Sequence, residues 1–235
     1  MRVAEKKKPA AGAAAAPESP VALPRPAADE APAECAPWAG HHPSELAHHG
    51  GECCTGARAW FLAMNRSMWR GQGGPAWIRR QWEWGPSRWP LHWCEAMEGE
   101  EIDCGAHAAL AAEAFRERGE RAVPVQLVQR YEAHNVPHWH HRWEEHGANP
   151  TWAGSGVVYH EACAVITDGR VEVWNATGSA WASPENVRGY GSIVAVRIGG
   201  PVATGETVLW GGREVPLGQW ISTAPAAPGK AAAAG

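Results

Sequence analysis

The amino-acid sequence predicts an α+β fold in which a helix that begins with a cysteine packs on an antiparallel β-sheet. Two observations carry this prediction. Helical patterns come first along the chain and β-patterned runs follow, an order that is typical of α+β proteins. The dipeptide Asp168-Gly169 separates the runs VVYHEACAVI and VEVWNAT, and D-G between two such runs is a strong signal for a tight β-hairpin.

Composition divides the chain into a central part and two tails. Residues 1 to 34 and 223 to 235 consist largely of small residues and proline, with few large apolar side chains. Such segments bury too little surface to offset the entropy of ordering them, so we expect both tails to be disordered. Residues 35 to 222 are expected to form a single domain of ordinary size.

Charge and hydropathy argue against several classes of protein. The formal net charge of −4, with no basic cluster beyond EKKK near the start, argues against nucleic-acid binding. No uninterrupted apolar run reaches the length of a membrane span, and proline interrupts the weak apolar run that follows the first basic residues. The six cysteines are too irregularly spaced for a disulfide scaffold. We therefore expect a cytoplasmic protein with reduced thiols and no cofactor; the oligomeric state is open.

The first part of the domain has two helical patterns. The segment SELAHH, with Ser44 as its cap and Gly50 as its stop, predicts a short helix. Residues 57 to 69 predict a second helix because Trp60, Met64 and Met68 recur every four residues on one face. The stretch 71 to 93 is rich in Gly, Pro and Trp and is expected to be irregular.

The clearest helix begins at Cys104. Leu110 and Phe115 belong to its apolar stripe, and Gly119 is expected to end it because glycine readily adopts the left-handed conformation of a helix C-terminus. The β-branched run that follows predicts a strand from Ala122 to Tyr131.

A long polar stretch, residues 132 to 156, separates this strand from the hairpin. It carries Trp and His clusters and is expected to be a loop, because loops of this length inside a domain are usually functional or disordered. It is our candidate for a substrate lid. The run SIVAVRI predicts a further strand after the hairpin.

The hairpin register places two polar residues side by side. If Asp168 and Gly169 form the turn, Ala162 pairs with Asn175. His160 then becomes a diagonal neighbour of Asn175 on the same face of the sheet, whereas a slip of one residue would separate them.

Cys104, His160 and Asn175 are the parts of a thiol nucleophile site. The N–H groups at a helix N-terminus favour a thiolate and can bind an oxyanion. A histidine carries the proton, and an asparagine fixes the orientation of its ring. These three residues are the predicted catalytic residues.

Two motifs resemble the transglutaminase-like superfamily of papain-like cysteine enzymes. DCGAHAALAAEAFRERGERAVPVQLV is similar to its cysteine helix and first strand, and YHEACAVITDGRVEVWNAT is similar to its histidine and acid motif. The resemblance covers residues 94 to 198 and implies Cys104 as nucleophile, His160 as base and Asn175 as the third member. Asn175 stands where the family generally has Asp, and Glu161 follows the histidine where a small or aromatic residue is commoner.

The resemblance implies cysteine-dependent acyl transfer, or formation or cleavage of an amide bond, through a thioester on a peptide or a small acyl or amine substrate. One alternative is a cysteine peptidase or amidase that uses water. Another is a transglutaminase-like module that only binds its ligand, with the Trp-rich stretch 77 to 93 as a recognition groove.

Other candidate residues have simpler interpretations. Cys163 falls on the strand face opposite His160 and is expected in the core, as are most tryptophans. His107 is a rival base or lines the same cleft. The clusters HHPSELAHH and HWHH suggest a metal site. The first puts His41 or His42 near Cys53 and Cys54, but the spacing matches no usual pair of metal ligands. We expect solvated histidines and no metal site.

Overall fold

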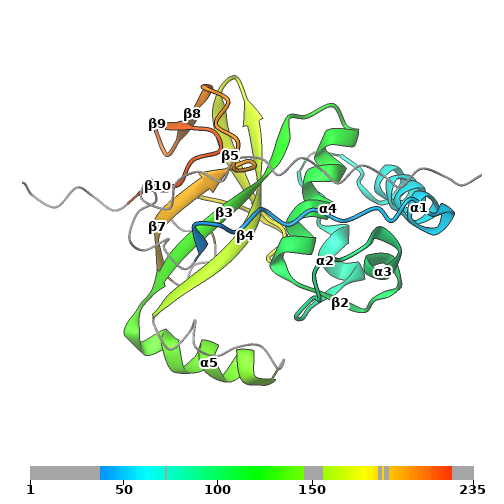
Figure 1. The fold of residues 1–235 in the computed structure, drawn as a ribbon, viewed down its shortest axis with the longest axis horizontal. Coiled ribbons are helices and arrows are strands. Elements are labelled where there is room, and N and C mark those ends of the chain that lie inside the picture. Colours follow the sequence, from blue (N-terminus) through cyan, green and yellow to red (C-terminus); the bar gives the residue numbers. More distant parts are fainter. Residues whose placement is uncertain (1–37, 72, 146–155, 185–186, 188–190, 224–235) are drawn as a thin grey trace, which may run out of the picture.

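The computed structural model describes residues 38–71, 73–145, 156–184, 187 and 191–223. The helices of the first half lie together on one side of the molecule, and a curved β-sheet forms the other side (Figure 1). The predicted α+β class is therefore confirmed. The two predicted tails lie outside the described residues, apart from Thr223.

The helical part is more extensive than predicted. The segment around Ser44 is extended instead of helical, and short helices form within the stretch 71 to 93 that was expected to be irregular. The helices are α1 (Glu52–Met68), α2 (Trp77–Gln81), α3 (Trp93–Glu98), α4 (Cys104–Glu117) and α5 (Val136–Glu145), with a 3-10 turn at Ala133–Asn135.

Helix α1 confirms the predicted helix, but it buries a face other than the one that carries Trp60 and Met68. Trp60 and Met68 are 43% and 47% exposed, whereas Phe61 and Asn65 are buried. The Asn65 side chain donates to the carbonyl of Ala114 at 3.1 Å and accepts from the indole of Trp77 at 2.9 Å. A buried amide with these partners fixes α1 against its neighbours, a role that apolar periodicity alone does not reveal.

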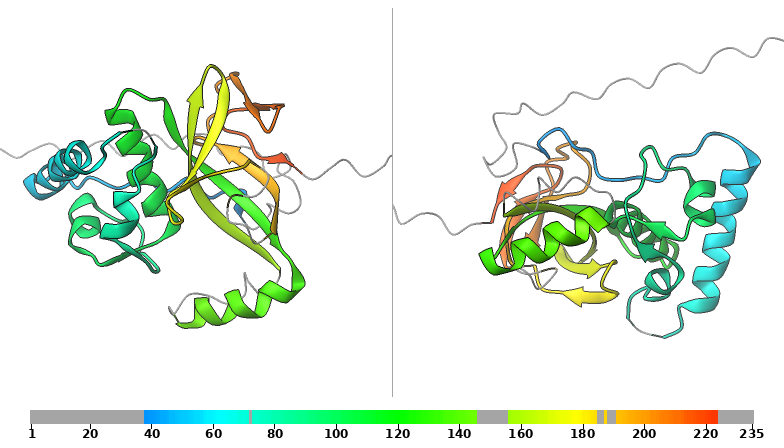
Figure 2. Two further views of the ribbon diagram at one scale, coloured as in Figure 1. Left: turned by 180° about the vertical axis from the view of Figure 1, so that it is seen from behind. Right: turned by 90° about the horizontal axis from the view of Figure 1, so that it is seen from below.

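Helix α4 begins and ends where the sequence predicted. Asp103 caps it by accepting the backbone N–H of Ala106 at 2.8 Å. Gly119 ends it with φ of +83°, and the N–H of Glu120 closes the last turn onto the carbonyl of Phe115 at 3.1 Å. Most of its side chains are buried, because the helix lies between the other helices and the sheet (Figures 1 and 2).

The main sheet has eight strands in the order β10-β7-β3-β4-β5-β8-β9, with β6 paired to β5. Its pairs are antiparallel except β5 with β8, and a separate parallel pair joins β1 and β2. The strands are β1 (Glu83–Trp84), β2 (Glu101–Ile102), β3 (Ala122–Tyr131), β4 (Val157–Thr167), β5 (Arg170–Asn175), β6 (Ala180–Ala182), β7 (Gly191–Ile198), β8 (Thr207–Trp210), β9 (Arg213–Pro216) and β10 (Ile221–Ser222).

The predicted hairpin is confirmed in its register. Asp168 and Gly169 form the turn with φ of +49° and +74°, and Cys163 pairs with Trp174. Positive φ at both turn positions matches the right-handed twist of the flanking strands.

The two faces of β4 pack against different cores. Cys163 and Val165 belong to the core that contains the α4 residue Phe115. Ala162 and Ala164 belong to a second core on the other face of the sheet, together with residues of β3, β5 and β7. Nearer the start of β4, Val157 and Tyr159 pack in a third cluster with Trp38, and Val158 packs in a fourth that Trp84 contacts.

The stretch 132 to 156, expected to be a loop, contains helix α5. Trp139 of this helix stacks on Tyr131 at the end of β3, with ring centroids 5.8 Å apart. The helix lies apart from the helical layer (Figure 1). Residues 146 to 155 lie outside the described part of the chain, and the substrate-lid hypothesis remains a prediction.

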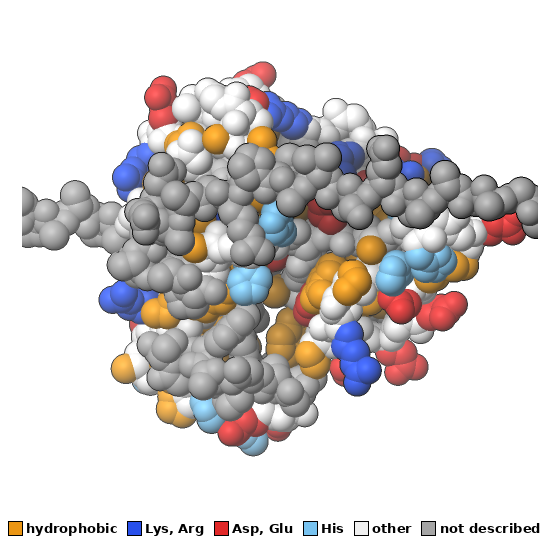
Figure 3. Space-filling model, in the orientation of Figure 1, with side chains coloured by type: hydrophobic (Ala, Val, Ile, Leu, Met, Phe, Trp, Pro, Cys, Tyr) orange, Lys and Arg blue, Asp and Glu red, His pale blue; other side chains and the backbone are white. Residues whose placement is uncertain are grey.

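In the described ranges, no helix has both the length and the apolar character that a membrane crossing requires. The face shown in Figure 3 carries acidic and basic side chains scattered around its edge, and hydrophobic atoms reach the surface on the helical side. Most tryptophans are core residues, as predicted, including Trp77, Trp82 and Trp174.

Candidate functional site

Cys104 is the first residue of α4 and is half-buried. The N-cap carboxylate of Asp103 also accepts the indole N–H of Trp89 at 2.7 Å. Gly105 follows the cysteine where the segment around Ser44 crosses the start of the helix. A Cβ at Gly105 would lie 2.6 Å from Ser44 Cβ, so only glycine fits there. The glycine thus allows the Ser44 segment to pack beside Cys104.

The structure brings His160 and Asn175 together. His160 Nε2 lies 3.3 Å from Asn175 Oδ1, and both side chains are buried. The Asn175 amide donates to the carbonyl of Val187 at 3.0 Å, which identifies its oxygen as the atom that faces the imidazole. Thr177 donates to the same oxygen at 3.1 Å. This half of the predicted site has the predicted geometry.

The surroundings of His160 on β4 link it to both parts of the molecule. His160 lies on β4 between Ala162, which packs in the second core, and Val158, which packs in a cluster that Trp84 contacts, while its neighbour Glu161 bonds to Ser44. Trp84 pairs with Ile102, two residues before Cys104, so the face of β4 that carries His160 also reaches the segment that leads into α4. The catalytic roles of the three residues remain predictions.

A buried polar network lies on the Cys104 side of β4. The backbone N–H of Ser44 donates to Glu161 Oε2 at 2.9 Å, and its hydroxyl lies 3.2 Å from Oε1. The Tyr159 hydroxyl donates to the same carboxyl group. Arg197 and Gln126 extend the network, because the Arg197 Nε donates to Gln126 Oε1 at 2.6 Å and the Gln126 amide donates to Tyr159.

Burial raises the pKa values of two groups in this network, Glu161 and Tyr159. It raises the pKa of Glu161 to about 7, although hydrogen bonds from Tyr159 and Ser44 act in the opposite direction. The pKa of Tyr159 is raised well above its ordinary value, mainly by burial and by the charge of Glu161, with a smaller contribution from Cys104. A charge on the Cys104 thiol therefore acts on the Tyr159 hydroxyl. Sequence reasoning noted Glu161 only as a departure from a family pattern.

Two other predicted candidates have core positions. His107 is buried, with Nδ1 2.9 Å from the carbonyl of Asp103 and Nε2 3.3 Å from the carbonyl of Trp82. Burial lowers its pKa, which favours the neutral ring. Cys163 is fully buried, as predicted, and burial raises the pKa of its thiol.

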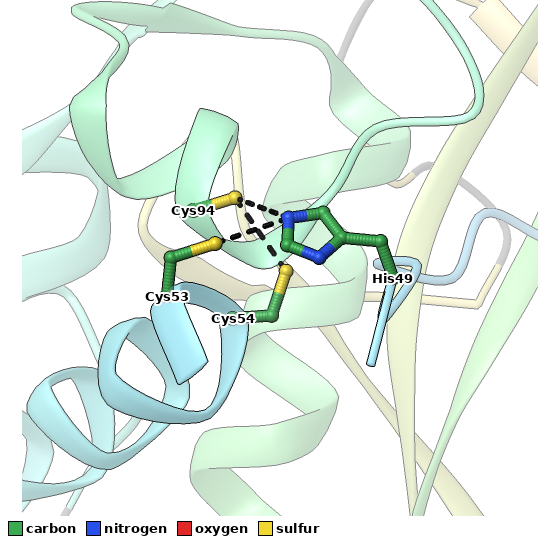
Figure 4. A group of neighbouring side chains, drawn as sticks. All are labelled: His49, Cys53, Cys54 and Cys94. Carbon is green, nitrogen blue, oxygen red and sulfur yellow. Dashed lines mark hydrogen bonds between the residues drawn. The ribbon is translucent and has the colours of Figure 1, made fainter. Parts of the chain in front are cut away.

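A second cluster joins His49, Cys53, Cys54 and Cys94 (Figure 4). One ligand atom from each residue lies within 4.8 Å of all the others. His49 Nε2 lies 3.0 Å from the Cys53 sulfur and 3.3 Å from the Cys94 sulfur, and the Cys54 and Cys94 sulfurs are 3.5 Å apart. The expectation of no metal site was based on local spacing, which did not reveal this arrangement.

The elements that carry this cluster explain why sequence reasoning missed it. Cys53 and Cys54 lie in the first turn of α1, and Cys94 lies in the first turn of α3, about forty residues away. His49 precedes α1 by one turn, in the extended segment that was predicted to be a helix. The signal in the sequence was H-x-x-x-C-C followed by a distant cysteine, and only the packing of α1 on α3 completes it.

The three thiols of the cluster influence one another. Burial alone would raise the pKa of Cys54, but hydrogen bonds from the backbone of His49 and Cys94 and from neighbouring thiols lower it to about 7. The pKa of Cys94 is raised, chiefly by its contact with Cys53 and by burial, to about 12. The Cys54 thiol is therefore more acidic than the Cys94 thiol.

No protein-family model, no curated protein and no solved structure matches this chain. Function is therefore argued from the side chains alone.

Proposed function

We propose that the protein is a cysteine-dependent acyltransferase or amide-bond enzyme of transglutaminase-like type, in which Cys104 is the nucleophile. The observation that carries this proposal is the position of Cys104 at the N-terminus of α4, on the side of β4 where a buried carboxyl group has a pKa of about 7. The two motifs that resemble the transglutaminase-like superfamily support the same chemistry. The substrate class is a peptide or a small acyl or amide compound.

The reaction proceeds through a thioester. The Cys104 sulfur attacks the substrate carbonyl carbon and forms a C–S bond, while the thiol proton passes to a base. The N–H groups in the first turn of α4 bind the oxyanion of the tetrahedral intermediate. When the C–N bond breaks, the departing amine takes up the proton. A second amine or water then attacks the thioester and releases the thiol.

Two residues are candidate bases for the proton transfer: His160, which the resemblance implies, and Glu161. A carboxyl group with a pKa near neutral pH exists in both protonation states there, so it both accepts and returns a proton. Glu161 points towards α4, and the Tyr159 hydroxyl that is bonded to it is coupled electrostatically to Cys104. His160 Nε2 faces the Asn175 oxygen at 3.3 Å, and variants of both residues test which of them is the base.

Trapping the acyl-enzyme tests the proposal. The full chain is mixed with p-nitrophenyl acetate, and each cysteine is then mapped by mass spectrometry. We expect a hydroxylamine-sensitive acetyl group on Cys104 and loss of ester turnover in Cys104→Ala. The same chain treated in urea is the control for non-specific acetylation of cysteines. Equal turnover by wild type and Cys104→Ala, with no adduct on Cys104, would contradict the proposal and favour a module that only binds.

The same reaction distinguishes transfer from hydrolysis. With glycine ethyl ester present, a transferase forms N-acetylglycine ethyl ester, whereas a peptidase or amidase releases acetate at an unchanged rate. Which product dominates depends on how completely the site excludes water.

A further inference from the structure

We infer that His49, Cys53, Cys54 and Cys94 form a structural zinc site. The site stands independently of the chemistry proposed for Cys104. Its donor set of three thiolates and one imidazole is among the commonest for structural zinc in proteins.

The geometry of the cluster fits a tetrahedral ion. With Zn–S bonds of about 2.3 Å, the sulfur ligands of a tetrahedral zinc lie about 3.8 Å apart. The Cys54 and Cys94 sulfurs are 3.5 Å apart, and all four donor atoms lie within 4.8 Å of one another. The four side chains converge on one small volume from three segments of the chain (Figure 4). Only small movements of the thiols are needed to bind the ion.

The histidine adopts the matching orientation. Its Nε2 points towards the Cys53 and Cys94 sulfurs, while Nδ1 points back towards the N–H of Gly51 at 3.3 Å. Coordination through Nε2 puts the ring proton on Nδ1, so the long contact to Gly51 gives way to a contact with water or a carbonyl group.

A soft divalent cation explains the cluster better than a disulfide. All three cysteines are thiols, and the distance between the Cys54 and Cys94 sulfurs is far from the length of a covalent S–S bond, about 2.05 Å. A disulfide would leave one cysteine and the histidine without a role. Thiolate and imidazole ligands select zinc over magnesium or calcium, which prefer oxygen ligands.

Four protein ligands leave no open position on the ion, so the site is structural. It joins the segment before α1 to the first turns of α1 and α3. Cys54 is fully buried and Cys94 packs against the same helical core, which places the site at the edge of that core. The segment that supplies His49 also supplies Ser44, which contacts Glu161 beside the start of α4. Zinc binding therefore holds this segment in place.

Metal content and cobalt spectra test the inference on the full chain. We expect one zinc per chain by inductively coupled plasma mass spectrometry after dialysis. Cobalt in place of zinc should give thiolate-to-cobalt charge-transfer bands and the intense visible bands of tetrahedral coordination. Cys54→Ser and Cys94→Ser should lose the metal, whereas His48→Ala and Cys104→Ala, outside the cluster, should retain it.

The wild-type spectrum keeps the test valid if a cluster variant does not fold. A wild-type protein that retains no zinc from zinc-containing buffer would overturn the inference, as would a cobalt spectrum without thiolate bands. A Cys54–Cys94 disulfide in protein purified without reductant, seen as the loss of two hydrogens in the intact mass, would also overturn it. Loss of acyl transfer in Cys104→Ala with zinc content intact would show that the two sites are separate.

Discussion

The backbone N–H of Ser44 donates to Glu161 Oε2 over 2.9 Å, and the two residues are 117 positions apart in the chain. This bond joins the segment before α1 to the middle of β4, at the point where α4 begins. The N-terminal segment therefore forms part of the wall beside Cys104.

The buried carboxyl group of Glu161 should make stability depend on pH. Its pKa is raised from 4.5 to about 7 in the folded protein, so its stabilising contribution is complete below pH 4.5 and is lost as the pH rises through 7. Between pH 5 and pH 8, wild type should lose about 2 to 3 kcal/mol relative to Glu161→Gln. Urea unfolding of both proteins, each with the same zinc content, measures this difference. Parallel pH profiles would contradict the raised pKa.

Gly105 should tolerate no side chain. Gly105→Ala places a Cβ against the side chain of Ser44 and should cost about 1 to 3 kcal/mol of unfolding free energy, because the crossing segment must move. Gly56→Ala in α1 is the control. A Cβ there meets nothing within 4 Å, and the change should be stabilising by about 0.5 to 1 kcal/mol. If both variants unfold at the same urea concentration, the contact between the segment and the helix is unimportant.

Asn175 should contribute more to stability than its neighbour Thr177. Asn175→Ala removes the partner of His160 and leaves the carbonyl of Val187 without its donor, at a cost of about 1 to 3 kcal/mol. Thr177→Val removes one half-buried hydroxyl and should cost less than about 1 kcal/mol. Nitrogen NMR of His160 should show the Nε2–H tautomer, which the asparagine oxygen requires. The opposite tautomer would show that the amide is reversed.

The pH dependence of turnover should identify the base. If Glu161 accepts the thiol proton, kcat/KM for p-nitrophenyl acetate should rise through pH 7 in wild type, and this rise should disappear in Glu161→Gln. His160→Gln should keep the rise even if the rate is lower. The reverse outcome, with the rise lost only in the histidine variant, would assign the base to His160.

Local sequence signals correctly predicted the features that depend on the backbone conformation of one or two residues. Gly119 and Asp168-Gly169 can adopt positive φ at low cost, so the end of α4 and the turn of the hairpin were correctly placed. The pairing of His160 with Asn175 followed from that turn alone. The buried face of α1 does not follow from apolar periodicity, because Asn65 is buried through hydrogen bonds to Ala114 and Trp77.

The two candidate sites differ in how far sequence could define them. Cys104 was found because a helix start is visible in the sequence. The buried carboxyl group of Glu161 beside the start of α4 was not, because it depends on the packing of the distant Ser44 segment. The cluster of His49 with three cysteines depends on the packing of α1 on α3, so no local spacing reveals it.

The alkylation rate of Cys104 as a function of pH tests the nucleophile most directly. The folded protein and the same chain in urea are treated with iodoacetamide between pH 5.5 and 9, and the modification of each cysteine is followed by mass spectrometry. An unfolded thiol titrates at about pH 8.5. We predict that folded Cys104 reacts several-fold faster than unfolded Cys104 at pH 6.5, because the first turn of α4 favours the thiolate. A folded rate that never exceeds the unfolded rate at any pH would contradict the assignment of Cys104 as nucleophile.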